Sequence, residues 1–142
     1  MIVMNGKTHI LFALAIGLIF LRIFPEFGVL LLSKILFSAG LLFGSLFPDF
    51  DLRIGFLKHR GILHSVYILF LAVLLGIFFN SLFSLFFGFA LGFFSHLIGD
   101  MITLEGIRPF YPLNFRIRGR LHSGGVIELL IIIILAFLIL FF

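Results

Sequence analysis

The clearest candidates for chemistry are His96 and Asp100, in the segment His-Leu-Ile-Gly-Asp. A spacing of four residues places both side chains on one face of a helix, where an imidazole nitrogen and a carboxylate oxygen can bind the same cation. A hydrogen-bonded His–Asp pair at a helix end would use the same spacing. The pair therefore needs further ligands nearby before it indicates a metal site.

Two acidic residues follow the second apolar stretch, in the segment Pro48-Asp49-Phe50-Asp51. In an extended or turn segment, Asp49 and Asp51 can bridge two metal ions, or divide between one ion and a histidine that binds it. The alternative is a pair of solvated acids beside Arg53 or Lys58.

A third candidate segment, His59-Arg60-Gly61-Ile62-Leu63-His64, joins two possible ligands to an arginine. The Arg60 guanidinium suits a phosphate or a carboxylate. Alternatively, Arg60 anchors the chain at the membrane surface and the histidines are interfacial. His64 stands beside an apolar stretch, where an ionisable side chain needs a partner.

Two further residues are candidates for the same site, because each lies at the start of an apolar stretch. His9 begins the first stretch, and Glu128 lies near the start of the last. Glu128 is either an additional ligand or general base, or an acid that favours the positive end of its helix. His122, in a basic loop, is expected to be an ordinary surface residue.

Composition places the chain in a membrane, because 63% of its residues are hydrophobic, 11% are charged and the mean hydropathy is +1.35. There is no cysteine, so a metal would be held by His, Asp, Glu, carbonyl oxygens or water. These ligands favour zinc, manganese, iron or magnesium. The basic residues flank apolar segments and form no basic arm, so no nucleic-acid partner is expected.

The apolar stretches predict an all-α fold, a polytopic membrane helical bundle of about five transmembrane helices in a single domain, 1–142. Two Gly-x-x-x-Gly pairs, Gly40 with Gly44 and Gly88 with Gly92, would let helices approach closely. The stretches cover residues 9–24, 28–47, 62–79, 82–98 and 126–142.

Five spans put the N-terminus, the loop 48–61 and the loop 99–125 on one side of the membrane, with eight of the ten basic residues. The excess of Lys and Arg predicts that this side, with the N-terminus, is cytoplasmic and that the chain is a multi-pass protein of the cell's inner membrane. The candidate acids and histidines fall on the same side, although the topology rests on Lys and Arg alone. A shared site explains this convergence.

The motifs together resemble the YdjM-like family of membrane-bound metal-dependent hydrolases, in family order over nearly the whole chain. The resemblance rests on Thr8-His9, Phe47-Pro48-Asp49-Phe50-Asp51, His59-Arg60-Gly61-Ile62-Leu63-His64-Ser65, Ser95-His96-Leu97-Ile98-Gly99-Asp100 with Thr103 and Gly106, and Gly124-Gly125-Val126-Ile127-Glu128.

This family is distantly similar to zinc-dependent phospholipase C, a phosphoesterase with several zinc ions and an HxxxD helix motif. His96 and Asp100 match that motif, and Asp49 and His64 match the Asp and His that precede it. The later HxxxE motif has no direct counterpart, since His122 and Glu128 are two residues too far apart. The resemblance implies one or two divalent ions, with zinc favoured and manganese or iron as alternatives.

The leading hypothesis is a membrane-embedded metal-dependent hydrolase, a phosphoesterase for a lipid-like or other anionic substrate at the cytoplasmic membrane face, acting through a metal-activated water. Its partners are the lipid bilayer and this substrate. A metal or proton transporter and a non-catalytic membrane scaffold are the alternatives. The expected metal ligands are His9, Asp49, His59, His64, His96 and Asp100, and the expected catalytic residues are Arg60, Glu128 and Asp51.

Overall fold

The fold is a bundle of α-helices, as the composition predicts. In a computed structural model that describes residues 6–25, 30–52, 60–122 and 126–141, strand pairing is limited to two isolated bridges, Thr103 with Leu121 and Ile107 with Ile117. The α-helices are α1 (Gly6–Ile23), α2 (Leu31–Leu46), α3 (Val66–Phe78), α4 (Phe83–Met101) and α5 (Val126–Phe141). The short 3₁₀ helices are η2 (Phe47–Leu52), η3 (Ile62–His64) and η4 (Asn80–Leu82).

Three helical segments are long and apolar enough to cross a membrane: Gly6–Ile23, Leu31–Leu52 and Asn80–Met101. Helices α3 and α5, with 13 and 16 residues, are shorter than the roughly 20 residues that cross a bilayer upright. The five predicted helices are therefore confirmed, and three of them reach the length of a span.

The 3₁₀ helix η2 replaces the extended or turn segment expected at Asp49 and Asp51. Pro48 has no backbone N–H, so the α-helical hydrogen-bond ladder of α2 cannot continue through it. The chain tightens into a 3₁₀ helix after Leu46, and this helix directs both aspartates from the end of α2.

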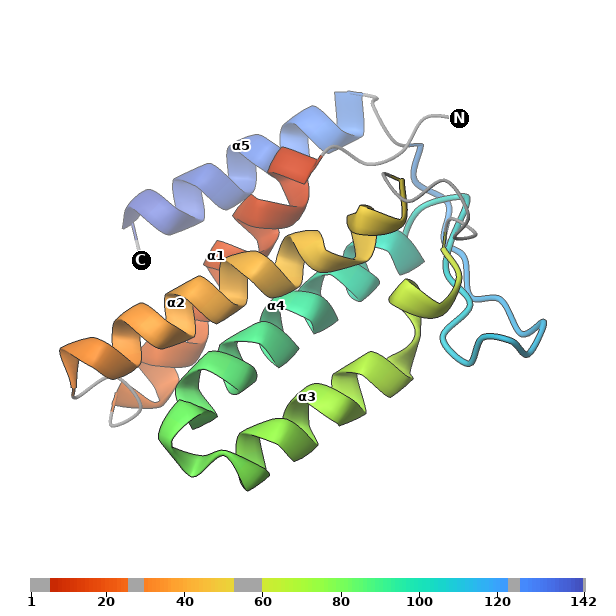
Figure 1. Ribbon diagram of the computed structural model, residues 1–142. Helices are drawn as coiled ribbons and strands as arrows, with labels where there is room; N and C mark the ends of the chain where they lie inside the picture. Colours follow the sequence, from red (N-terminus) through yellow and green to blue (C-terminus); the bar gives the residue numbers. More distant parts are fainter. Residues whose placement is uncertain (1–5, 26–29, 53–59, 123–125, 142) are drawn as a thin grey trace.

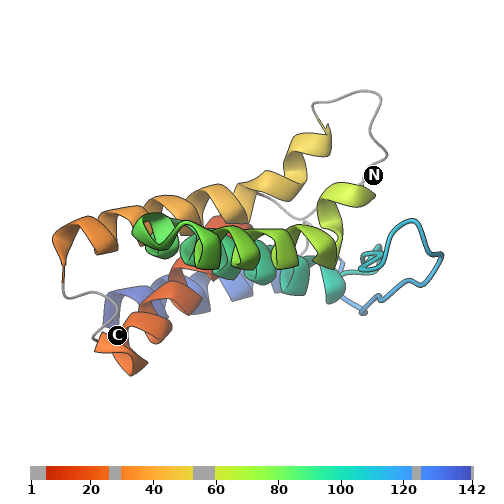
Figure 2. The ribbon, with the colours of Figure 1, turned by 60° about the horizontal axis from the view of Figure 1, so that its bottom comes forward.

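Helix α4 lies at the centre of the bundle and packs against α1, α2 and α3, whereas α5 packs on α1 (Figures 1 and 2). It is the most buried of the three spanning segments. One buried cluster joins Ala13, Phe37 and Leu41, and a second joins Phe93, Leu97 and Ile107 nearer the polar end. The central helix therefore carries His96 and Asp100 in surroundings that exclude solvent.

The two Gly-x-x-x-Gly pairs face each other across the contact between α2 and α4. A Cβ atom added at Gly40 or Gly44 would overlap the backbone carbonyl of Leu85 or Phe89 in α4. Reciprocally, a Cβ at Gly88 or Gly92 would overlap backbone carbonyls of α2. The absence of side chains at these four positions lets the two backbones touch, as small residues do in membrane helix pairs.

Replacing Gly44 by leucine should therefore lower the free energy of unfolding by about 3 kcal/mol, because the new side chain must separate two backbones. Denaturant unfolding of the purified protein in detergent, followed by circular dichroism, measures the change. Ala39→Leu adds similar bulk to an exposed position of the same helix and should change stability by less than about 0.5 kcal/mol. Equal losses in both variants would contradict the proposed packing.

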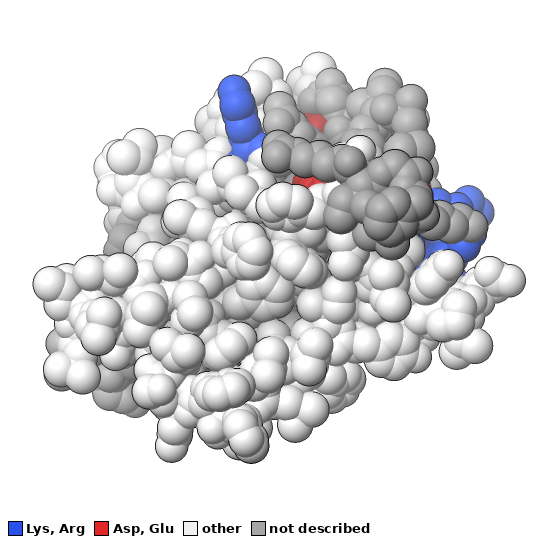
Figure 3. All heavy atoms as spheres, in the orientation of Figure 1, with Lys and Arg blue, Asp and Glu red and all other residues white. Residues whose placement is uncertain are grey.

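One end of the bundle gathers the polar segments of the chain. The start of α1, η2, η3, the end of α4 and the start of α5 meet there, beside the loop of residues 102–122 (Figure 1). On the face drawn in Figure 3, the visible Lys, Arg, Asp and Glu side chains of the described residues lie at this end. The expected convergence of polar residues is thus present in the fold.

Candidate metal centre

A buried cluster of histidines and carboxylates occupies this polar end. Its members come from four helices that are far apart in the sequence, so the cluster exists only in the folded protein. Its members are His9 from α1, Asp49 and Asp51 from η2, His64 from η3, and His96 and Asp100 from α4. All three histidines are fully buried, and Asp49 is the most exposed member, at 19%.

The backbone of α2 orients the imidazole of His96. The Nδ1 atom lies 2.7 Å from the carbonyl oxygen of Ser45, which can only accept a hydrogen bond. Nδ1 therefore carries the proton, and a neutral ring presents the lone pair of Nε2. Nε2 is buried without a hydrogen-bond partner, 3.6 Å from Asp49 Oδ1 and 3.6 Å from Asp100 Oδ2. A metal-binding histidine held by a carbonyl has this arrangement.

Asp100 stands at the centre of the cluster, with its two oxygens turned to different neighbours. Oδ1 accepts a hydrogen bond from Arg60 Nη2 at 3.0 Å and lies 3.7 Å from His9 Nε2. Oδ2 lies 3.2 Å from His64 Nε2 and 3.6 Å from His96 Nε2. This carboxylate therefore touches every histidine of the cluster.

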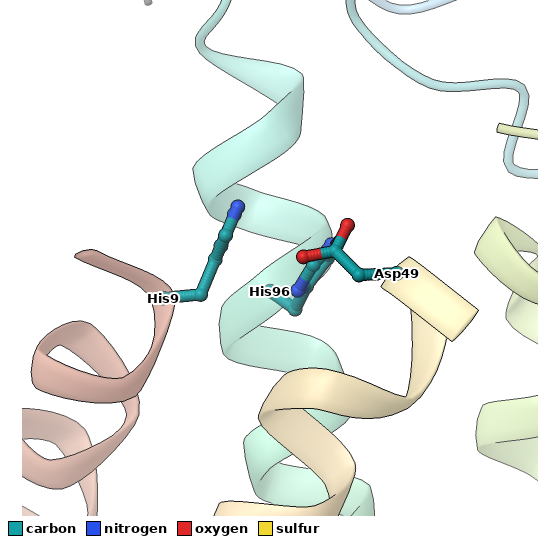
Figure 4. Close-up of side chains that lie close together, drawn as sticks. All are labelled: His9, Asp49 and His96. Carbon is teal, nitrogen blue, oxygen red and sulfur yellow. Dashed lines mark ion pairs between the residues drawn. The ribbon is translucent and has the colours of Figure 1, made fainter. Parts of the chain in front are cut away.

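His9 and Asp49 complete the cluster on the side away from η3. The rings of His9 and His96 stack with centroids 3.8 Å apart, and Figure 4 shows His9, His96 and Asp49 pointing toward one another from α1, α4 and η2. Both ring nitrogens of His9 and Oδ1 of Asp49 are buried without a hydrogen-bond partner. Leaving buried polar atoms without hydrogen bonds is costly, so the convergence of these atoms indicates a binding partner that the protein itself does not supply.

The separations between these atoms suit a cation. Two ligand atoms bound tetrahedrally to zinc at its usual distances are roughly 3.3 Å apart. The nitrogen–oxygen separations across the cluster run from 3.2 to 3.7 Å, and several are too long for hydrogen bonds. Among the described residues, two groups have ligand atoms within 4.8 Å of one another: His9, Asp49 and His96, and His64, His96 and Asp100.

Asp51 faces His64 and the backbone of Arg60. Its Oδ2 accepts a hydrogen bond from the Arg60 N–H at 2.8 Å and lies 3.2 Å from His64 Nδ1. Arg60 adopts a left-handed backbone conformation, with φ of 58°, which is uncommon for a residue other than glycine. The hydrogen bond to Asp51 helps to hold this conformation, which is of the strained kind that gathers at functional sites.

The Arg60 side chain is buried and turned inward. Nη2 donates to Asp100, and Nη1 donates to the carbonyl of Gly106 at 2.8 Å and to Thr103 Oγ1 at 3.3 Å. The residue type suggested that this guanidinium would bind an anionic substrate. The structure instead places protein acceptors against both terminal nitrogens, because the loop after α4 folds back over Arg60.

The remaining predicted residues lie around the cluster or outside the described part of the chain. Glu128 is buried and accepts a 2.6 Å hydrogen bond from Thr8, the neighbour of His9, so it ties α5 to α1. It belongs to neither group of possible metal ligands in the described residues. His59 lies outside the described residues, and His122 is exposed, as expected for a surface residue.

Two contacts of the cluster were not anticipated. The carbonyl of Ser45 is a backbone group and has no signal in the residue type, although Pro48 three residues later has no N–H to donate to it. Thr103 accepts from Arg60 and donates to the Asp100 carbonyl at 2.7 Å. Its position, three residues after Asp100, could have suggested this bond, because Ser and Thr commonly bond backbone carbonyls three or four residues earlier.

These features define an α-helical membrane protein with a buried His/Asp cluster able to hold a metal ion. A family model, that of the YdjM inner membrane protein family, matches residues 4–142, and the chain belongs to this family. Comparisons with the curated proteins and with the solved structures found no match.

Proposed function

We propose that the protein is a metal-dependent hydrolase, a phosphoesterase whose cation is held by His9, Asp49, His96 and Asp100, with His64 as a further ligand. The observation that carries the proposal is the orientation of His96. Its Nδ1 is committed to the Ser45 carbonyl, and its Nε2 points between two carboxylates without a hydrogen bond. Only Nε2 of His96 is available to a metal ion, so His96 binds a single cation.

The charge of the cluster supports a divalent ion. With the histidines neutral, the three carboxylates of the cluster outnumber the one guanidinium in contact with it, that of Arg60, which pairs with Asp100 and also lies 3.7 Å from Glu105. The described residues of the site therefore carry negative charge in excess. Uncompensated charge is costly in a buried, membrane-embedded site. A divalent cation balances this excess, and the imidazole and carboxylate donors fit zinc, manganese or iron.

The chain's own residues divide into ligands and groups that position them. Ser45 and Asp51 hold His96 and His64 through Nδ1, so that each Nε2 faces Asp100. Arg60 is a positioning residue, because Nη2 donates to Asp100 Oδ1 and Nη1 donates to Gly106 and Thr103. Asp49 is the most exposed member, so we assign it to the side from which a substrate enters.

When bound, the cation would lower the pKa of a water molecule and polarise the scissile group, the two requirements for hydrolysis near neutral pH. The position of the cluster at one end of the bundle supports a site at the level of the lipid headgroups. A transporter would need such ligands near the middle of the membrane with access from both sides. The location therefore favours a phosphorylated, lipid-like substrate at the membrane surface.

The direct test of this function is turnover by protein reconstituted in liposomes and loaded with zinc or manganese. A panel of phosphorylated lipids, ester lipids and peptides is supplied, and released phosphate, fatty acid and amine are measured. We expect phosphate release that a chelator abolishes and added metal restores. Turnover of peptides or esters alone would contradict a phosphoesterase.

We also propose that the N-terminus and the metal cluster lie on the cytoplasmic side and the C-terminus on the opposite side. Eight of the ten basic residues fall in segments assigned to the cytoplasmic side. A reporter enzyme that works only outside the cytoplasm should be active when it is fused to the C-terminus. A cysteine introduced at the exposed position Arg116 should react only with thiol reagents supplied from the cytoplasmic side. The reverse pattern would overturn this orientation.

A further inference from the structure

An apolar hollow in the described part of the protein lies between α2 and α3. It has a volume of about 300 Å³ and is lined by residues of α2, α3 and α4, including Gly40, Ala72 and Leu75. Helix α4 separates α2 from α3 (Figure 1) and forms the floor of the hollow. Ala72 contributes only a methyl group to this lining. We call this hollow the α2–α3 groove.

The α2–α3 groove and the metal cluster share η2 and α4, and helix α3 of the groove directly follows η3, which carries His64. Phe47, at one end of the groove, precedes Asp49 by two residues, and Ile68 follows His64 by four. Phe89, on the floor, lies seven residues before His96, which is about 10 Å along α4. Each wall of the groove thus leads, within about two helical turns, to a residue of the cluster.

The side chains change from wholly apolar in the α2–α3 groove to ionisable in the metal cluster. The groove lining contains only glycine, alanine, leucine, isoleucine and phenylalanine, whereas the cluster holds three carboxylates and three histidines. A molecule that fits both has a hydrocarbon chain joined to a charged group that a cation attracts. An extended acyl chain also matches a groove that runs along the helices, because membrane lipids lie in that direction.

We propose that the α2–α3 groove binds one acyl chain of the phosphorylated lipid on which the cluster acts, with the phosphate of this lipid at Asp49. This inference rests on the proposed function, since it is the cation that attracts the headgroup. Without a cation, the carboxylates of the cluster repel an anionic headgroup. Binding of a phosphorylated lipid should therefore require the metal, whereas lipids that merely surround the protein need none.

The test uses a phosphatidate with a photoactivatable group on its acyl chain and the full-length, metal-loaded protein in liposomes. Crosslinked peptides are identified by mass spectrometry, and metal content is measured on the same sample. We expect crosslinks on α2 and α3 at the groove. Excess unlabelled phosphatidate should reduce them at least fivefold, phosphatidylcholine should not, and a chelator should remove them.

Ala72→Phe fills the groove and should reduce these crosslinks at least fivefold without changing metal content. Ala72 is 4% exposed, whereas Leu74, in the same helix, is 62% exposed, so Leu74→Phe is the matched control and should leave the crosslinks unchanged. Leu75→Phe provides a second filling variant if Ala72→Phe folds poorly.

Equal competition by both lipids, or unchanged crosslinks in the filling variants, would overturn the proposed lipid site. Metal-dependent crosslinking without any phosphate release would retain the lipid site and remove the proposed hydrolysis. The two proposals can therefore fail separately.

Discussion

Purified His96→Ala protein is expected to bind zinc at least about a hundredfold more weakly than the wild type. Changes to partners of metal ligands already cost 10–100-fold in affinity, and this substitution removes a ligand that Ser45 orients toward both Asp49 and Asp100. The measurement is a competition titration with a chromophoric chelator, accompanied by elemental analysis.

The matched control for this prediction is His122→Ala, because His122 is exposed and lies outside the cluster. It should keep the wild-type metal content. Asp100→Ala should behave as His96→Ala does, although the loss of the Arg60 partner will also lower stability. Wild-type affinity in both cluster variants would remove the proposed site.

The second large effect is expected for Asp49→Asn, which should lower phosphate release at least about a hundredfold. Asparagine keeps the size of the side chain but loses the negative charge that faces His96 Nε2. Since Asp49 is partly exposed, the substitution should change folding little, and thermal unfolding of the metal-free protein should be close to that of the wild type.

His64→Ala should reduce phosphate release as well, since His64 lies 3.2 Å from Asp100 and is held by Asp51. Asp51→Asn is the test of the positioning role. It should weaken metal binding less than His64→Ala does, because the ligand remains and only its orientation is lost. Full activity in Asp49→Asn and His64→Ala would contradict their assignment.

The pattern of residues predicted the fold class and most members of the cluster. Apolar stretches between prolines and loops indicate helices because the membrane leaves backbone groups no other partners. His96 and Asp100 could be placed on one face from their spacing, and Asp49 and His64 could be brought to them from the topology. These inferences use only the helical periodicity and the alternation of successive loops between the two sides of the membrane.

The inner contacts of the cluster could not be predicted, because they depend on how segments distant in sequence meet. Arg60 reaches Gly106 and Thr103 only because the loop after α4 folds back, with Gly106 at a φ of 60°. The Ser45 carbonyl meets His96 only because Gly44 and Gly92 let α2 touch α4. The sequence contains the glycine motifs, but it does not indicate which helices they bring together.

The most direct test of the account is X-ray absorption spectroscopy at the metal edge, combined with elemental analysis, on wild-type protein purified without a histidine tag. We predict about one divalent transition-metal ion per chain. Because the chain has no cysteine, its ligands should be nitrogen and oxygen only, at about 2.0–2.2 Å for zinc, with the scattering pattern of imidazole. Protein that is folded, remains metal-free after incubation with zinc, manganese or iron, and has the same stability with and without these ions would contradict it.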